Sequence, residues 1–140
     1  MGFHNARSRF ENELVKVLTE ELGDDWFGQR GTHSYGIDVI MFKSSDNVIS
    51  PKAVLFEVKS ISKWPFYLSA KNKQQYERYL QLLEDKGVEV IYAMRLMGEK
   101  VDKWRFARIT NFSTTSRSNP CLKHDDTEGL LTFVHSLNTI

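Results

Sequence analysis

Apolar and polar residues follow patterns along the chain that predict three helices and several strands. Apolar residues recur at spacings of three and four over 5–22, which is typical of an amphipathic helix with one buried face. Similar patterns predict helices over 69–86, with Ser69 as N-cap, and over 125–137. Gly23 and Gly87 are predicted to end the first two helices. The order of the elements predicts an α/β fold in a single domain over 1–140, with a central mixed β-sheet flanked by helices. Short, mainly apolar runs predict strands at 26–30, 36–42, 53–60 and 88–96, and the alternation of 103–109 predicts an edge strand.

Two of these strands each contain one acid among apolar residues. Asp38 interrupts the first, and Glu57 interrupts the second, two positions before Lys59. Alternate residues of a strand point to the same face, so Glu57 and Lys59 project together while Val58 turns away. Because a buried charge is costly unless it is paired or binds a metal, both acids are candidate metal ligands. The structural alternative is an ion pair between Lys59 and Asp38 across neighbouring strands.

Composition narrows the classes of site that the chain can contain. The single Cys121 excludes an internal disulfide and a cysteine zinc cluster, and the four histidines show no metal-ligand spacing. No apolar run is long enough to cross a bilayer. Together with the lone thiol, this predicts a reducing intracellular, cytoplasmic setting.

The charge distribution bears on nucleic acid as a partner. The net charge is only +1, which argues mildly against such a partner. Basic residues nevertheless concentrate in 1–10, 61–80 and 95–108, so a neutral total can conceal a basic face. The alternative for any one of these clusters is a solvated surface.

The chemistry of the embedded acids points to phosphodiester hydrolysis. The carboxylates of Asp38 and Glu57 and the carbonyl of Val58 are oxygen ligands of the kind that Mg²⁺ prefers, and Mn²⁺ is expected to substitute. Such an ion neutralises a phosphate oxygen and lowers the pKa of a bound water. Lys59 is placed to stabilise the negative charge that develops in the reaction.

The arrangement resembles a known group of nucleases. Asp38 on one strand and Glu57-Val58-Lys59 on the next resemble the PD-(D/E)xK superfamily and, more narrowly, the archaeal-type Holliday-junction resolvases. Residues 9–14 (RFENEL) are similar to the helix that opens those proteins and carries a catalytic Glu. Gln75, followed by Tyr76, is similar to a Gln on their next helix. The resemblance spans residues 5–110 and implies a restriction-endonuclease-like core.

The resemblance also implies a third acid. Glu11 takes the position of the helical Glu, as a catalytic residue and a further metal ligand, and Glu13 is the competing candidate. The implied catalytic residues are therefore Glu11, Asp38, Glu57 and Lys59, and the implied metal ligands are Asp38, Glu57, Val58 and Glu11.

The activity that the resemblance implies is that of a Mg²⁺-dependent DNA endonuclease. It would act in recombination and repair as a homodimer that nicks opposing strands of a four-way junction. The alternatives are another PD-(D/E)xK endonuclease, of restriction or mobile-element type, and a non-catalytic DNA-binding module with this fold. In the loop before Asp38, Thr32 competes with Ser34 for a contact to DNA. The residues expected to contact DNA are Arg7, Arg9, Arg30, Ser34, Lys63, Lys71, Lys73 and Gln75.

Overall fold

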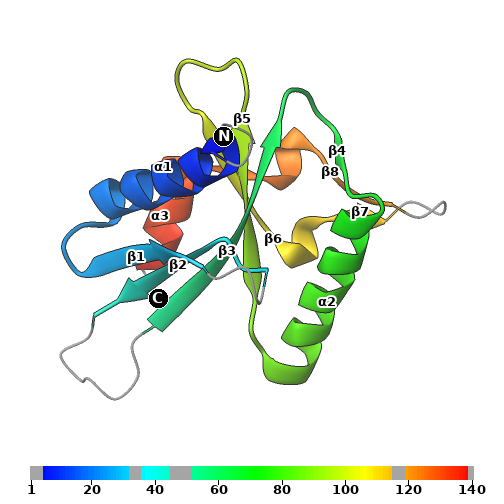
Figure 1. Cartoon of the computed structure of the whole chain (residues 1–140), viewed down its shortest axis with the longest axis horizontal. Helices are drawn as coiled ribbons and strands as arrows, with labels where there is room; N and C mark the ends of the chain where they lie inside the picture. The colour runs from blue at the N-terminus through cyan, green and yellow to red at the C-terminus, as the bar shows by residue number, and fades with distance from the viewer. Residues whose placement is uncertain (1–4, 32–35, 45–51, 115–118, 139–140) are drawn as a thin grey trace. The chain divides into compact units, whose positions relative to one another are not determined.

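The computed structural model describes residues 5–31, 36–44, 52–114 and 119–138. They belong to two compact units, one made of residues 1–58 and 131–140 and the other of residues 59–130. The predicted α/β class is confirmed, since helices accompany a six-stranded main sheet and a smaller three-stranded one (Figure 1). That the chain works as a single domain stays a prediction. In the described ranges, no helix has the length and apolar character that a membrane crossing requires.

The first unit is a sheet covered by helices. Strand β2 pairs antiparallel with both β1 and β3. Helix α1 has the predicted bounds and buries one apolar stripe, and α3 places Phe133 edge-on against Phe56 with 5.9 Å between ring centroids. The elements of this unit are α1 (Asn5–Leu22), β1 (Trp26–Arg30), β2 (Val39–Lys43), the first part of β3 (Lys52–Ile61) and, from its second residue, α3 (Leu130–Asn138).

A glycine ends helix α1, as the pattern predicts. Gly23 has φ +96°, a left-handed conformation that a residue without Cβ adopts at little cost. Its N–H donates to the carbonyl of Thr19 at 3.2 Å. The chain turns at once into β1, where Trp26 is buried and its indole N–H donates to Asn138 Oδ1 at 3.3 Å.

The second unit contains helix α2 and strands that belong to each of the two sheets. Strand β6 lies between β5 and β9, so the prediction of an edge strand at 103–109 is wrong. The helix predicted over 125–137 begins only at Leu130. The elements are β4 (Phe66–Tyr67), α2 (Lys71–Lys86), β5 (Val90–Leu96), β6 (Trp104–Arg108), η1 (Ile109–Asn111), β7 (Ser113–Thr114), β8 (Pro120–Leu122), η2 (His124–Asp126) and β9 (Glu128–Gly129).

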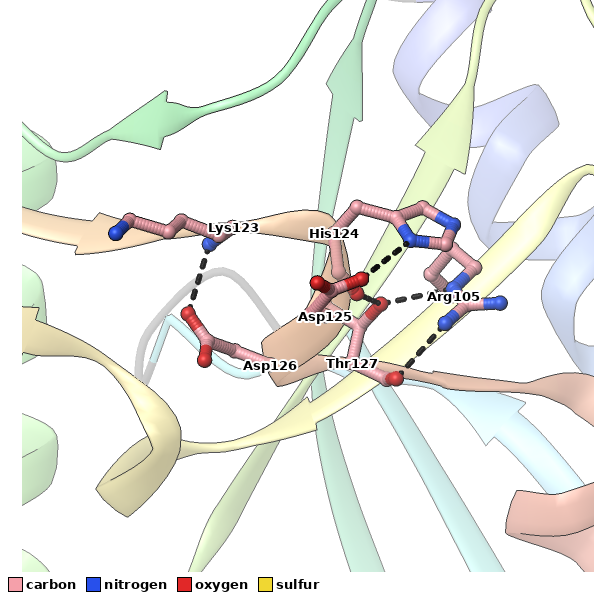
Figure 2. Close-up of polar contacts among 6 residues, drawn as sticks. All are labelled: Arg105, Lys123, His124, Asp125, Asp126 and Thr127. Atoms are coloured by element: carbon pink, nitrogen blue, oxygen red, sulfur yellow. Dashed lines mark hydrogen bonds and ion pairs between the residues drawn. The ribbon is translucent and has the colours of Figure 1, made fainter.

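Hydrogen bonds at and beside Thr127 explain both errors. Arg105 donates through Nε to Thr127 Oγ1 and through Nη2 to the Thr127 carbonyl, each at 2.8 Å (Figure 2). The hydroxyl of Thr127 donates back to the His124 carbonyl at 2.6 Å. Asp126 accepts from the backbone N–H of Lys123 at 3.0 Å. These bonds hold the segment before α3 as a turn and a short strand beside β6, so the helix starts later than periodicity indicates.

Aromatic contacts fix helix α2 within its unit. Tyr76 packs against Phe112 and Tyr79 against Tyr92, with ring centroids 5.2 and 6.3 Å apart. Burial raises the pKa of Tyr76 above its usual value. Gly87 ends the helix in a left-handed conformation, as predicted. The prediction of Ser69 as N-cap is wrong, because the cap is Ala70, which makes no side-chain bond.

Candidate functional site

Burial distinguishes three carboxylates of the first unit. Among the described residues, the buried polar or charged ones, judged by the exposure of the whole residue, are Glu11, Asp38, Glu57 and Thr127. The three acids are the ones that the sequence predicts as catalytic, and they are 4%, 6% and 0% exposed. Acidic side chains are seldom buried unless they are paired or bind a cation. Three buried acids in one small unit therefore favour a functional site over a solvated surface.

Backbone groups of Phe56, Gly31 and Val58 hold Asp38 through hydrogen bonds. Its N–H donates to the Phe56 carbonyl at 3.0 Å and its carbonyl accepts from the Gly31 N–H at 2.8 Å. Its side-chain Oδ2 accepts from the N–H of Val58 at 2.8 Å. Val39 also pairs with Phe56, so two successive residues face one residue of β3, as in a β-bulge. The predicted strand over 36–42 therefore begins only at Val39, and the carboxylate of Asp38 takes the place of a backbone acceptor.

Gly31 permits the close approach that fixes Asp38. A Cβ built on Gly31 would lie 1.9 Å from the carbonyl oxygen of Ile37, and this backbone atom has no freedom to rotate away. The pairing of β1 with β2 continues past Arg30 through the bond from Gly31 to Asp38. Glycine at this position therefore lets the two backbones meet beside the candidate ligand.

Glu57 occupies the most buried part of strand β3. Its side chain is 0% exposed, and Phe56 and Val58 on either side are also buried. The neighbouring Val58 N–H is the donor to Asp38. Asp38 and Glu57 therefore both lie where the pairing of β2 with β3 ends. That their carboxylates share one ion stays a prediction.

Glu11 is bound to a residue that the sequence predicts as a DNA contact. Its Oε1 accepts from Nε of Arg30 at 3.0 Å. Nη2 of Arg30 also donates to the hydroxyl of Ser8 at 2.9 Å. The Glu11 side chain is 5% exposed and that of Arg30 is 39% exposed, so the acid is buried and the base reaches solvent. The competing candidate, Glu13, is only half-buried.

The donor set fits a hard divalent cation at two carboxylates. Asp38 and Glu57 supply carboxylate oxygens and Val58 a carbonyl, and Mg²⁺ is commonly held by one or two carboxylates with waters completing its shell. In the part of the chain that the structure describes, no three His, Cys, Asp or Glu side chains form a group that could hold an ion. Glu11, which binds Arg30, therefore does not complete a three-carboxylate cluster in this arrangement, and its role as a ligand stays a prediction.

Lys59 begins the second unit, where two amides of helix α2 hold its side chain. Nζ donates to Asn72 Oδ1 at 2.9 Å and to Gln75 Oε1 at 3.2 Å. Residues three apart lie on the same helix face, so both amides approach the ammonium group together. Gln75, expected to contact DNA, thus contacts the predicted catalytic lysine.

The remaining predicted DNA contacts lie mostly on the surface. Lys63 and Lys71 are exposed, and Lys73 is half-buried. Arg9 is exposed, and its guanidinium lies 5.3 Å from the ring centroid of Phe10, within cation–π range. Their binding to DNA stays a prediction.

Three of the residues named for the DNA surface are not described at side-chain level. Arg7 lies in α1, but its side chain is outside the described residues. Ser34 and its competitor Thr32 also lie outside the described residues.

The sequence did not lead us to three residues that contribute to the candidate site, which are Asn72, Ser8 and Gly31. Asn72 stands three positions before Gln75, and this spacing was the available signal for a shared helix face. Ser8 stands three positions before Glu11 in helix α1, so the same spacing places both on one helix face. For Gly31 the sequence carries no such signal, because its requirement comes from the carbonyl of Ile37.

Comparison with solved structures supports the fold. The chain is similar to Hjc, a Holliday junction resolvase from the archaeal hyperthermophile Archaeoglobus fulgidus, with a TM-score of 0.64 and 20% sequence identity. The match covers 91% of this chain and 94% of that one. No model of a protein family matches the sequence, and no curated protein matches it. At this identity the likeness confirms the nuclease-like fold, and membership of the resolvase family stays a prediction.

Proposed function

We propose that the chain is a Mg²⁺-dependent DNA endonuclease that cuts four-way junctions as a homodimer. The observation that carries the proposal is the bond from the Val58 N–H to Asp38, directly beside the fully buried Glu57. Burying an acid is costly unless it is paired or binds a cation, so two buried acids at the same point of a strand pair support a cation site. The fold shared with a junction resolvase supports the choice of reaction and substrate.

The proposed metal ligands are the carboxylates of Asp38 and Glu57 and the carbonyl of Val58, joined by Glu11 once its carboxylate leaves Arg30. When bound, the ion supplies charge neutralisation at the phosphate and a more acidic water as nucleophile. Mn²⁺ is proposed to substitute for Mg²⁺, because both accept oxygen ligands of this kind.

The protein's own residues set the geometry in this proposal. The Val58 N–H fixes one oxygen of Asp38, so the carboxylate is oriented before any substrate arrives. Lys59 follows Glu57 by two positions in β3, and its ammonium would stabilise negative charge that develops on the phosphate. Lysines 63, 71 and 73 would bind phosphates without reading sequence.

A homodimer is proposed because of the symmetry of the substrate. A four-way junction is close to two-fold symmetric, and two copies of one chain related by a two-fold axis place two equivalent sites on it. Each site would then nick one of two opposing strands.

The test compares a synthetic four-way junction with a linear duplex of the same arm sequence, each incubated with protein and Mg²⁺. We expect paired nicks in the junction and little cutting of the duplex. Glu57→Gln should abolish cutting while DNA binding persists. Glu84→Gln is the matched control, because Glu84-Asp85-Lys86 repeats the Glu-x-Lys spacing at the exposed end of α2.

The possible results separate the alternatives. Equal cutting of both substrates would remove the junction specificity and leave an endonuclease of another type. Binding without cutting, in Mg²⁺ or Mn²⁺, would indicate a non-catalytic DNA-binding module. Absence of binding even at low salt would contradict any role with DNA, because phosphate contacts strengthen as salt falls.

A further inference from the structure

The first turn of helix α2 holds a lysine with two neutral side chains. Nζ of Lys59 donates to the amide oxygens of Asn72 at 2.9 Å and Gln75 at 3.2 Å. We propose that Asn72 is a positioning residue, which together with Gln75 places the ammonium group of Lys59 for its action on the phosphate. The inference rests on the proposed function only for the role of Lys59; the positioning itself can be measured without it.

The chemical type of the two partners supports this role. An amide oxygen accepts a hydrogen bond from an ammonium group without cancelling its charge, whereas a carboxylate would form an ion pair. Acids are favoured at helix N-termini, yet the first turn of α2 contains none and begins with Lys71. The turn therefore lacks a favourable helix-end interaction and presents two amide oxygens to Lys59 without adding a negative charge of its own.

The start of α2 is anchored, so its side chains occupy defined positions. Leu68 is fully buried, and its N–H donates to the Pro120 carbonyl at 2.9 Å. Ala70 then adopts φ +52° and ψ −122°, a conformation that costs a non-glycine residue free energy. Its carbonyl accepts the first helical bonds, from Lys73 at 3.1 Å and Gln74 at 3.2 Å.

Packing fixes the helix at Gln75, the second of the two residues that accept from Lys59. Tyr76 follows Gln75 directly and is buried against Phe112. Asn72 itself is exposed and Gln75 is half-buried, so neither is needed to fill the core. A surface residue that contacts a half-buried lysine from an anchored helix is placed to orient that lysine.

The alternative is that Asn72 is an ordinary surface residue of the helix. Two measurements distinguish the roles. The first is ¹H–¹⁵N NMR of lysine NζH₃⁺ groups at one fixed pH and low temperature, where hydrogen-bonded ammonium groups exchange slowly enough to be seen. The Lys59 signal is assigned by its loss in Lys59→Gln. The second is single-turnover cleavage of the junction with Mg²⁺, alongside DNA affinity.

Four variants make the test specific. Asn72→Leu keeps the approximate volume and removes the acceptor, and Asn72→Asp keeps an acceptor but adds a negative charge. Gln74→Leu and Gln74→Glu make the same kinds of change at an exposed position of the same helix, whereas Lys59 donates to the residues at 72 and 75. They control for helix propensity and for general repulsion of DNA.

We expect Asn72→Leu to weaken or remove the Lys59 NMR signal and to slow cleavage on the order of tenfold to a hundredfold, with DNA affinity nearly unchanged, since a misplacement of about 1 Å costs about that much. Asn72→Asp should keep the signal and still slow cleavage. The Gln74 variants should leave the signal and the rate of the cleavage step close to those of the unchanged protein.

Two results would overturn the inference. An unchanged Lys59 signal in Asn72→Leu would show that the amide does not hold the lysine. A changed signal with unchanged cleavage would show that the contact is structural. If the unchanged protein never cuts DNA, the proposed function fails, and the NMR result alone then decides whether Asn72 positions Lys59.

Discussion

The backbone N–H of Val58 donates a hydrogen bond of 2.8 Å to the carboxylate of Asp38, twenty positions earlier in the chain. Two consequences follow from this one bond. It gives a buried backbone donor its acceptor, and it sets the orientation of the acid next to Glu57. The structural role of Asp38 and its proposed catalytic role are therefore separable by substitution.

Asp38→Asn should retain most of the stability and lose cleavage. An asparagine keeps an amide oxygen for the Val58 N–H but lacks the charge that a cation requires. Asp38→Ala removes the acceptor as well and should lower the free energy of unfolding by about 1–3 kcal/mol, the cost of a buried donor left without a partner. Urea unfolding of the three proteins measures the difference. Equal stability of Asp38→Ala and the unchanged protein would contradict this role of the bond.

Gly31→Ala should destabilise the first unit and impair the site without touching a ligand. The added Cβ would meet the Ile37 carbonyl at 1.9 Å, so the strands must separate next to Asp38, at a cost of about 1–3 kcal/mol. Gly129→Ala is the control, because a Cβ there finds only Arg105, at an ordinary 3.6 Å. Thermal unfolding and Mn²⁺ binding of both variants provide the comparison, and similar results for the two would count against the close approach.

The ion pair of Arg30 with Glu11 should appear as an energetic coupling. Arg30→Leu removes a partner of a buried carboxylate and should cost about 1–2 kcal/mol, less than for a fully buried pair because Arg30 is partly solvated. Glu11→Gln in the same background should recover part of the loss. A double-mutant cycle in urea gives the coupling free energy, and a value near zero would show that the pair contributes nothing to folding.

Ala70→Gly should stabilise the protein although it removes a methyl group. Ala70 has φ +52°, where glycine avoids the penalty that Cβ imposes. The relief of strain should exceed the entropy that glycine adds to the unfolded chain and leave a gain of about 1 kcal/mol. Ala53→Gly, at an exposed position in β3, should instead lower stability by about 0.5–1 kcal/mol. Denaturant midpoints of the two variants should move in opposite directions.

Local patterns in the sequence determined a large part of the fold. The apolar spacing of three and four gave the bounds of α1, and Gly23 and Gly87 marked the ends of two helices, because helix formation and termination depend on residues a few positions apart. Asp38 and Glu57 were recognisable as unusual because each interrupts an apolar run, and burial of both is confirmed.

Tertiary structure alone decided which distant residues meet. The Thr127 bonds that place β9 beside β6, the carbonyl that excludes a side chain at Gly31, the pairing of Glu11 with Arg30 and the contact of Asn72 with Lys59 all join different elements of the fold. Hydrophobic periodicity reports which side of a segment is buried, but it contains no information about the partner on the other side. The candidate ligands were therefore readable from the sequence by itself, whereas the side chains that orient them became visible only when the chain was folded.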